Sequence, residues 1–129
     1  MCAATAATEP VIRRDALEAG VHVNSVGYTT TGREVDAETV RDALVVVESR
    51  AAAMAESNDL RWAIRDGIAA EEPLHAELGE IVAGTRPGRT GREQVTLYKS
   101  LGVAAEDDAA AALALAAAER EGAGAVVEL

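Results

Sequence analysis

Residues 44–47 of the chain read Leu-Val-Val-Val, and a helical pattern begins shortly after them at Ser49. A continuous run of apolar, mostly β-branched residues is typical of a parallel strand that is covered on both faces. A β-branched segment over 21–26 and an alternating segment over 94–98 predict two further strands. Strands that alternate with helices indicate an α/β fold with a parallel sheet.

Helical patterns fill the intervals between these strands. A short one runs over 11–19, and Asp36 is the candidate N-cap of another over 35–43. The remaining helices are expected over 49–57, 59–67, 77–83 and 103–121. The chain opens on what resembles the end of a strand at 2–8 and closes on another strand-like segment at 126–129. It therefore reads as a piece of a larger α/β protein.

The composition excludes several classes of protein. The 129 residues, 49% apolar and 26% charged, match about one domain, and that apolar fraction excludes a disordered chain. No apolar run is long enough to cross a membrane, and the first residues do not resemble a signal peptide. One cysteine excludes an internal disulfide framework. We therefore expect a cytoplasmic protein with no membrane partner.

The net charge of −10 argues against one class of binding partner. Neutralising the phosphates of a nucleic acid needs an excess of Lys and Arg, so we expect no nucleic acid partner. An acidic, alanine-rich and lysine-poor composition suits a protein that works in concentrated salt, where charge repulsion is screened. A GC-rich genome also favours Ala and Arg codons, and both explanations stay open.

Several polar features have a structural explanation that we favour over a functional one. The segment 84–92 resembles a phosphate loop but lacks its lysine and its spacing, which predicts a solvated loop. His22 and His75 have no second ligand at metal spacing, so we expect no metal site. The acids at 106–108 complement a helix dipole, and Trp62 predicts core packing or a subunit interface.

Two loops are the candidate ligand site. The loop 27–32 follows one predicted strand, and the segment 97–102 runs from another strand directly into a helix. In an open parallel sheet, ligands bind beyond the carboxyl ends of the strands. Thr5, Asn24 and Gly27 lie at such ends, and the free amides of a helix N-terminus attract an anion near 97–102.

Five stretches carry a more specific signal: Val23–Gly27, Arg33–Asp36, Val45–Arg50, His75–Glu80 with 83–84 and 87–89, and Thr96–Val103 with 106–107. In this order and spacing they resemble the ornithine cyclodeaminase and mu-crystallin family across nearly the whole chain. The resemblance implies an α/β fold with a partial Rossmann-type parallel sheet and flanking helices over 1–102. Over 103–129 it implies a helix and strand that return to a substrate and dimerisation domain.

The chemistry that the resemblance implies is hydride transfer between NAD or NADP and the α-carbon of an amino acid or imine. Family members convert ornithine to proline, reduce cyclic ketimines or oxidise alanine, and are expected to be homodimers. The glycine-rich dinucleotide fingerprint of the family is absent from this sequence, as are the Arg and Lys that grip the substrate carboxylate.

By the same resemblance, a set of residues at the two loops serves the reaction. The expected cofactor contacts are Thr5, Val26, Gly27, Lys99 and Ser100, and the expected substrate contact is Leu101.

The catalytic aspartate of the cyclodeaminase falls at Thr29, or at Tyr28 if the loop is shortened earlier. Neither side chain can act as a carboxylate base near neutral pH, so we expect no catalytic residue in this chain. Imine reduction or amino-acid dehydrogenation then fits better than ornithine cyclisation. The alternative hypothesis is a non-catalytic remnant or an interaction module that needs a partner chain.

Overall fold

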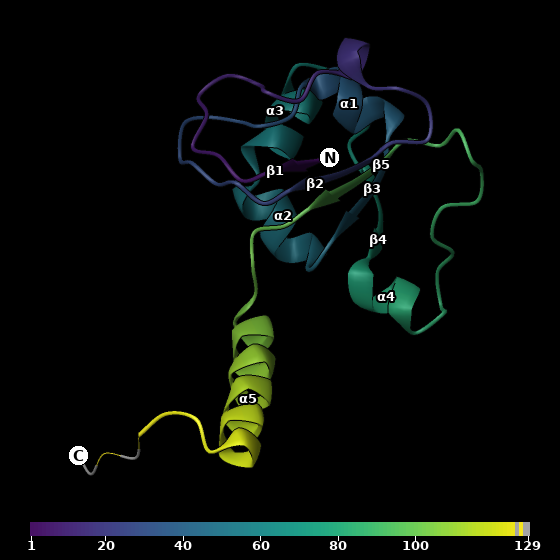
Figure 1. The fold of residues 1–129 in the computed structure, drawn as a ribbon. Helices are drawn as coiled ribbons and strands as arrows, with labels where there is room; N and C mark the ends of the chain where they lie inside the picture. Colours follow the sequence, from purple (N-terminus) through teal and green to yellow (C-terminus); the bar gives the residue numbers. More distant parts are fainter. Residues whose placement is uncertain (126, 128–129) are drawn as a thin grey trace.

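The computed structural model describes residues 1–125 and Val127 of the chain. Within these residues, five parallel strands form one sheet in the order β1-β2-β5-β3-β4 (Figure 1). The strands are β1 (Cys2–Ala3), β2 (His22–Ser25), β3 (Leu44–Val47), β4 (Leu74–Glu77) and β5 (Thr96–Lys99). The expected α/β fold with a parallel sheet is confirmed.

The last strand of the described residues lies at the centre of the sheet. β5 pairs with β2 on one side and with β3 on the other. In this register Lys99 stands between Ser25 and Val47, at the carboxyl ends of three neighbouring strands. Residues far apart in the sequence are thereby brought to one edge, where ligands of open parallel sheets bind.

One face of the sheet is closed by helices. These are α1 (Ala37–Asp42), α2 (Arg50–Glu56) and α3 (Asn58–Arg65). Alternate strand residues point to this face, and Val23, Val45 and Leu97 are fully buried there in one cluster with Val40 and Leu60. Burial of these apolar side chains stabilises the strand ends that carry the candidate loops.

Side-chain caps define where the three helices begin. The carboxylate of Asp36 accepts a hydrogen bond from Thr39 N at 2.9 Å, which confirms the expected cap of α1. Ser49 caps α2 and Ser57 caps α3 in the same way. Because Ser57 is the cap, α3 begins at Asn58, one residue before the expected start, and Asp59 lies within its first turn.

Two expectations at the level of elements were wrong. The helix expected over 11–19 is reduced to the single 3-10 turn η1 (Arg14–Ala16), because Val11 and Ile12 instead donate backbone hydrogen bonds to Glu34. The strand β4 was not expected at all, since its four residues Leu-His-Ala-Glu include none of the β-branched residues, Phe, Tyr or Trp that favour strands. Its pairing with β3 overrides that weak local preference.

The opposite face of the sheet is only partly covered, by α4 (Leu78–Val82) and the segment 84–92. Apolar side chains of β3 and α4 face a groove there, among them Leu44, Val46 and Ile81. Arg89 holds the segment 84–92 against the sheet by donating to the carbonyls of Gly20 and Val21.

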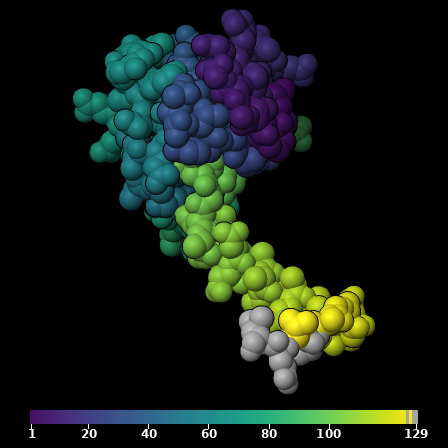
Figure 2. Space-filling view, turned by 90° about the vertical axis from the view of Figure 1, so that its left-hand side faces the viewer, coloured from purple at the N-terminus to yellow at the C-terminus, as the bar shows by residue number. Residues whose placement is uncertain are grey.

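The helix α5 (Ala104–Glu121) extends away from the sheet (Figures 1 and 2). Within the described residues none of its side chains is buried, and Leu113 and Leu115 are largely exposed. The strand expected over 126–129 lies outside the described residues, apart from Val127. In the part of the chain that the structure describes, no helix combines the length and the apolar character needed to cross a membrane.

Candidate functional site

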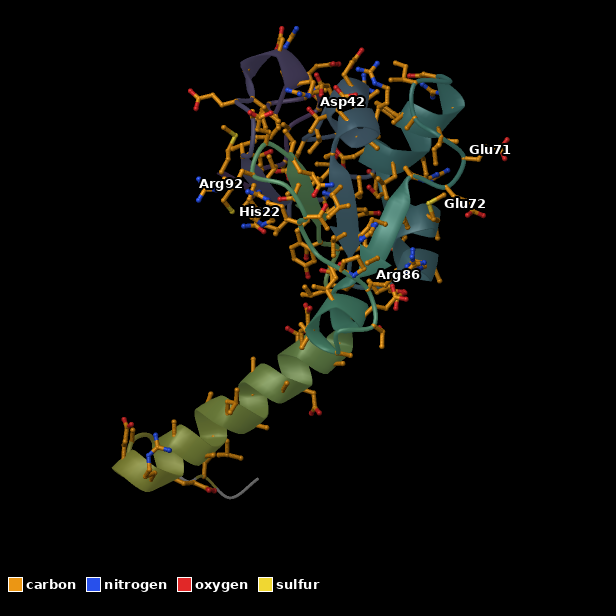
Figure 3. All side chains as sticks on the ribbon, turned by 90° about the vertical axis from the view of Figure 1, so that its right-hand side faces the viewer. His22, Asp42, Glu71, Glu72, Arg86 and Arg92 are labelled. Atoms are coloured by element: carbon orange, nitrogen blue, oxygen red, sulfur yellow. The ribbon has the colours of Figure 1, made fainter. Side chains whose placement is uncertain are left out.

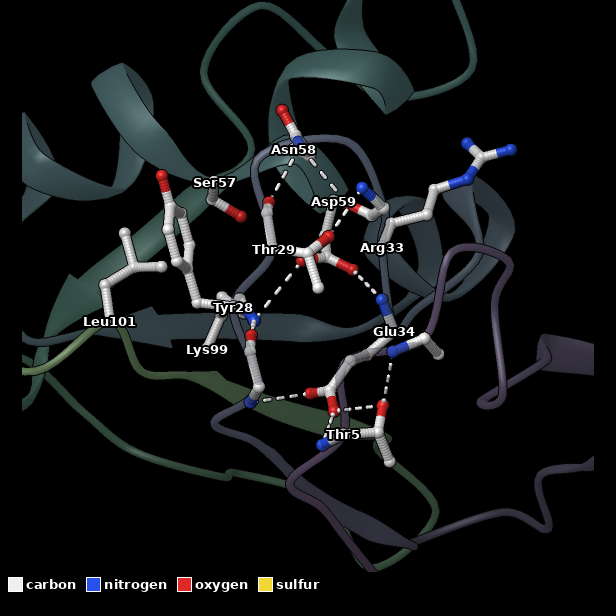
Figure 4. A pocket seen from close by; sticks show the side chains of 13 residues that line it. Thr5, Tyr28, Thr29, Arg33, Glu34, Ser57, Asn58, Asp59, Lys99 and Leu101 are labelled. Carbon is white, nitrogen blue, oxygen red and sulfur yellow. Dashed lines mark hydrogen bonds and ion pairs between the residues drawn. The ribbon is translucent and has the colours of Figure 1, made fainter.

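A narrow cleft opens at the carboxyl ends of β2 and β5 and beside the segment after β1 (Figure 4). Its walls come from that segment, the loop after β2, the start of α3 and the end of β5. The expected cofactor and substrate contacts that line it are Thr5, Gly27, Lys99 and Leu101, and Tyr28 and Thr29, at the position of the family's aspartate, line it too.

The other two expected cofactor contacts adjoin the cleft without lining it. Val26 is 43% exposed, and its backbone N–H is bonded to Ala3 O at 2.9 Å. Ser100 donates its backbone N–H to Ser25 O at 2.9 Å. The structure therefore brings both candidate loops to one edge of the sheet, as their positions after strands predict.

A buried carboxylate at Glu34 organises the floor of the cleft. Glu34 is 2% exposed and accepts hydrogen bonds from the backbone and hydroxyl of Thr5, from Ser25 Oγ at 2.7 Å and from Gly27 N at 2.9 Å. Burial alone would raise the pKa of Glu34, but these hydrogen bonds outweigh it and hold the pKa below its ordinary value. Glu34 is therefore an anion at neutral pH.

A second buried carboxylate, Asp59, joins α3 to the same segment. One oxygen accepts from Glu34 N and Val35 N, both at 2.8 Å, and the other lies 3.3 Å from Lys99 Nζ. Lys99 is 1% exposed and also donates to Gly27 O at 2.7 Å and to Ser25 Oγ at 3.1 Å. Buried charges of this kind persist only when they are paired and hydrogen-bonded.

The loop after β2 is tightly packed where it turns. A Cβ atom added at Gly27 would overlap the Glu34 carboxylate and the carbonyl of Thr5. Further along, Asn58 Nδ2 donates to the carbonyls of Thr29 and Gly32, at 3.2 and 3.1 Å. These contacts give the loop one defined backbone path. The small and polar residues of the loop would not fix that path by themselves.

The second loop is held by Glu48, at the end of β3. Its carboxylate accepts from the backbone N–H groups of Leu101 and Gly102, both at 3.3 Å. Burial would raise the pKa of Glu48, but hydrogen bonds from Ser100 and from these backbone groups hold it below the ordinary value. Burial and the neighbouring Glu48 charge raise the pKa of Tyr98 to about 12, so its hydroxyl stays protonated.

Sequence reasoning did not single out Glu34, Asp59 or Asn58 as site residues. Glu34 belongs to the stretch Arg33–Asp36 that carries the family resemblance, so a signal existed. Asp59 and Asn58 resemble ordinary residues at a helix start, because only the tertiary fold shows that their side chains reach the loop.

The two histidines and the arginines of the segment 84–92 have partners elsewhere in the described fold, or lie apart. His22 bonds Thr96 and Asn24, His75 bonds Pro87 O, and no group of three potential metal ligands is found there. Arg86 and Arg92 stand apart along the segment 84–92 (Figure 3), while Arg89 is occupied by backbone carbonyls and Thr96.

Fold and cleft define a class: a parallel α/β domain with a cleft at the carboxyl edge of its sheet. The model of the ornithine cyclodeaminase/mu-crystallin family matches residues 1–121, and the chain belongs to that family.

Its relatives include oxidoreductases. The chain is 41% identical over 105 residues to a Δ1-pyrroline-2-carboxylate reductase of Bacillus cereus, covering 80% of this chain and 32% of the relative. It is 40% identical over 110 residues to the ketimine reductase mu-crystallin of Mus musculus, covering 84% and 32% of the two chains. The chain thus spans about a third of the length of these curated relatives.

A solved structure extends the likeness to the fold. The Δ1-pyrroline-2-carboxylate reductase of Thermococcus litoralis, in complex with NADH and L-proline, matches with a TM-score of 0.90 and 42% identity. The match covers 98% of this chain and 39% of that chain. The partial Rossmann-type sheet expected from the resemblance is thereby confirmed.

The residues present fit one end of a dinucleotide better than the other. Val26, beside the cleft, and Tyr28, which lines it, are 43% and 53% exposed and offer an apolar surface next to fixed backbone groups. Such a surface suits a planar ring. The sequence has no G-x-G-x-x-G turn, so a cradle for the pyrophosphate is not built from these residues.

Proposed function

We propose that this chain forms the nicotinamide side of the NAD(P) site in an oxidoreductase that reduces imines or oxidises amino acids. The observation that carries the proposal is the pair of loops at the carboxyl edge, one held by Glu34 and the other by Glu48. When bound, the cofactor would supply or accept a hydride. The chain's residues would orient its ring against the substrate and exclude water from that side.

The proposed roles follow the positions of the side chains. Thr5, Val26, Gly27 and Ser100 would contact the cofactor, and Leu101 would contact the substrate. Tyr28 and Thr29 occupy the loop where the cyclodeaminase reaction would need a carboxylate. The substrate class is therefore an amino acid or imine that exchanges hydride without side-chain cyclisation, as in the named activities of the reductase relatives.

Several properties of the whole protein belong to the same proposal. Residues 1–102 would complete a Rossmann-type domain, and residues 103–129 would return to a substrate domain that forms a homodimer. A cytoplasmic location agrees with the single cysteine, and the acidic composition agrees with work in concentrated salt.

A non-catalytic interaction module is the second candidate. The exposed helix α5 favours it, because within the described residues this helix buries nothing and its leucines face solvent. This candidate predicts a partner chain that covers α5, with no role for the loops 27–32 and 97–102.

Calorimetric titration of NADH distinguishes the two candidates. The isolated 129-residue chain should bind no NADH at submillimolar concentration, even in high salt, because it lacks the pyrophosphate turn. A chimera, in which this chain replaces the matching segment of the Bacillus cereus reductase, should bind NADH. Binding by the isolated chain would contradict the assignment of the site to one end of the cofactor. A folded chimera without binding would favour the interaction module.

A further inference from the structure

The chain's one lysine is buried at the centre of the cleft floor. Lys99 ends the central strand β5, and its side chain is 1% exposed. Its ammonium faces three acceptors: Gly27 O at 2.7 Å, Ser25 Oγ at 3.1 Å and Asp59 Oδ2 at 3.3 Å. Two of its N–H donors form hydrogen bonds, with Gly27 O and Ser25 Oγ, and its charge is paired with Asp59. Because the side chain is buried, the ammonium does not reach the outer surface of the loop, where a cofactor would lie.

The backbone of Gly27 is held from both sides by buried charges. Its N–H donates to the Glu34 carboxylate at 2.9 Å, and its carbonyl accepts from the Lys99 ammonium at 2.7 Å. Hydrogen bonds in which one partner is ionised are the stronger kind. Two such bonds on successive backbone groups fix where the turn lies and how its peptide planes are oriented.

The same charges connect three distant segments. Asp59 pairs with Lys99 and also accepts from the backbone of Glu34, while Ser25 donates to Glu34 and accepts from Lys99. The strand β5, the start of α3 and the loop after β2 therefore meet in one closed network (Figure 4). A simple apolar core would pack these elements together without fixing the loop backbone.

We propose that Lys99 is a positioning residue, which acts on the cofactor through Gly27 and not by contact. Paired with Asp59, it holds the Gly27 carbonyl while Glu34 holds the Gly27 amide, and together they set the surface of Val26 to Tyr28 against which the ring would lie. This inference rests on the proposed function and replaces the direct contact expected from the resemblance.

The first test uses the complete 129-residue chain and needs no cofactor. Lys99→Met alone leaves Asp59 as an unpaired buried charge and should lower the unfolding midpoint strongly. Adding Asp59→Asn removes that charge, while the amide oxygen still accepts from Glu34 N and Val35 N, so the midpoint should recover. Despite the recovery, hydrogen exchange of the Gly27 amide should quicken by about tenfold or more. The amide keeps its bond to Glu34, but the turn loses the charge-assisted bond at the Gly27 carbonyl that holds it in place.

The exchange experiment compares the amide of the loop with amides of the core, so it separates a local change at Gly27 from a loss of global stability. The amides of Val45 and Leu97, in the buried core, should exchange at unchanged rates relative to global unfolding in the double variant. Glu80→Gln is the matched control, because it removes a short ion pair, Arg50–Glu80 at 2.6 Å, that lies away from the loop. Equal protection of Gly27 in the parent chain and in the double variant would overturn the proposal.

A second measurement separates positioning from cofactor contact. In the reductase chimera, the double variant Lys99→Met/Asp59→Asn should lower kcat for imine reduction more than it raises KM for NADH, because the ring is misaligned and not released. A rise in KM alone would indicate direct contact and overturn the positioning role. If the parent chimera binds no NADH, the proposed function fails, while the exchange experiment still decides the role of Lys99.

Discussion

Glu34 shows how one residue can join the segment after β1 to the loop after β2. Its two oxygens receive hydrogen bonds from Thr5, Ser25 and Gly27, and all of these partners are donors. A carboxylate suits that environment because it only accepts. The side chain stabilises the fold and shapes the candidate site through the same contacts.

Glu34→Gln should therefore destabilise the chain by about 1–3 kcal/mol, because its amide group would turn N–H donors toward other donors. Urea unfolding followed by the fluorescence of Trp62, the single tryptophan, measures this. Glu71→Gln, at an exposed acid, is the control and should change stability by less than about 0.5 kcal/mol. Equal effects of the two substitutions would contradict the assigned role of Glu34.

The pH dependence of stability follows from the same carboxylate. The pKa of Glu34 lies below its ordinary value of 4.5 in the folded chain, so the folded state favours the anion. Its contribution is complete above the ordinary pKa and is lost as pH falls through the folded pKa. The stability difference between the parent chain and Glu34→Gln should thus be constant near neutrality and shrink below pH 4.5. A difference that grows in acid would have the wrong sign.

Two glycines provide opposite outcomes for the same substitution. Gly27→Ala should destabilise the chain and displace the loop, because the Cβ would overlap Glu34 and Thr5. Gly79→Ala places its Cβ in open space within α4 and should stabilise the chain by about 0.5–1 kcal/mol, the helix preference of Ala over Gly. Thermal unfolding of both variants checks the pair. Destabilisation by Gly79→Ala would contradict the open space that surrounds a Cβ atom at this position of α4.

At the residue scale, the sequence predicted which loops meet but not what holds them. Thr5, Gly27, Lys99 and Leu101 could be placed together because they follow parallel strands. The partners Glu34 and Asp59 could not, because burial of a carboxylate depends on contacts between segments 25 residues apart in sequence. Local pattern carries no information about such contacts.

At the scale of the elements, the carboxylate of Asp36 stabilises both the helix α1 and the turn η1. One carboxylate oxygen caps α1 through Thr39 N, and the other accepts from Arg14 N at 2.9 Å, which secures the turn η1. Asp36→Ala should cost about 0.5–2 kcal/mol for the cap alone, and more because of the second bond. Ser49→Ala removes only the longer capping bond of α2, at 3.3 Å, and should cost less. Urea unfolding ranks the two, and a larger loss for Ser49→Ala would contradict this reading.

A helix or strand was predictable from the sequence where its local pattern agreed with the pairing that the folded chain imposes. The strands β2, β3 and β5 and the cap at Asp36 follow from β-branched runs and capping chemistry. The segment 11–19 has a helical pattern, yet its backbone bonds Glu34, so tertiary pairing prevails. The strand β4 follows from its neighbour β3 and not from its own residues.

At the scale of the whole molecule, the uncovered surfaces lead to a prediction about association. Leu113 and Leu115 of α5 and Val82 of α4 are exposed at 74%, 61% and 80%, and the groove beside β3 is lined by apolar side chains. Exposed apolar surface of this kind favours association. The 129-residue chain should therefore self-associate with rising concentration in sedimentation velocity, and a chain ending at Val103 should do so less. A monodisperse monomer over the whole concentration range would contradict this prediction.

The central claim is that the two loops present the nicotinamide end of an NAD(P) site to an imine or amino-acid carbon. The most direct measurement is oxidation of NADH by Δ1-pyrroline-2-carboxylate, catalysed by the chimera with the Bacillus cereus reductase. We expect steady turnover by the chimera and a severe loss of turnover in its Gly27→Ala variant, with Gly79→Ala active. A folded chimera that binds NADH but transfers no hydride would contradict the claim.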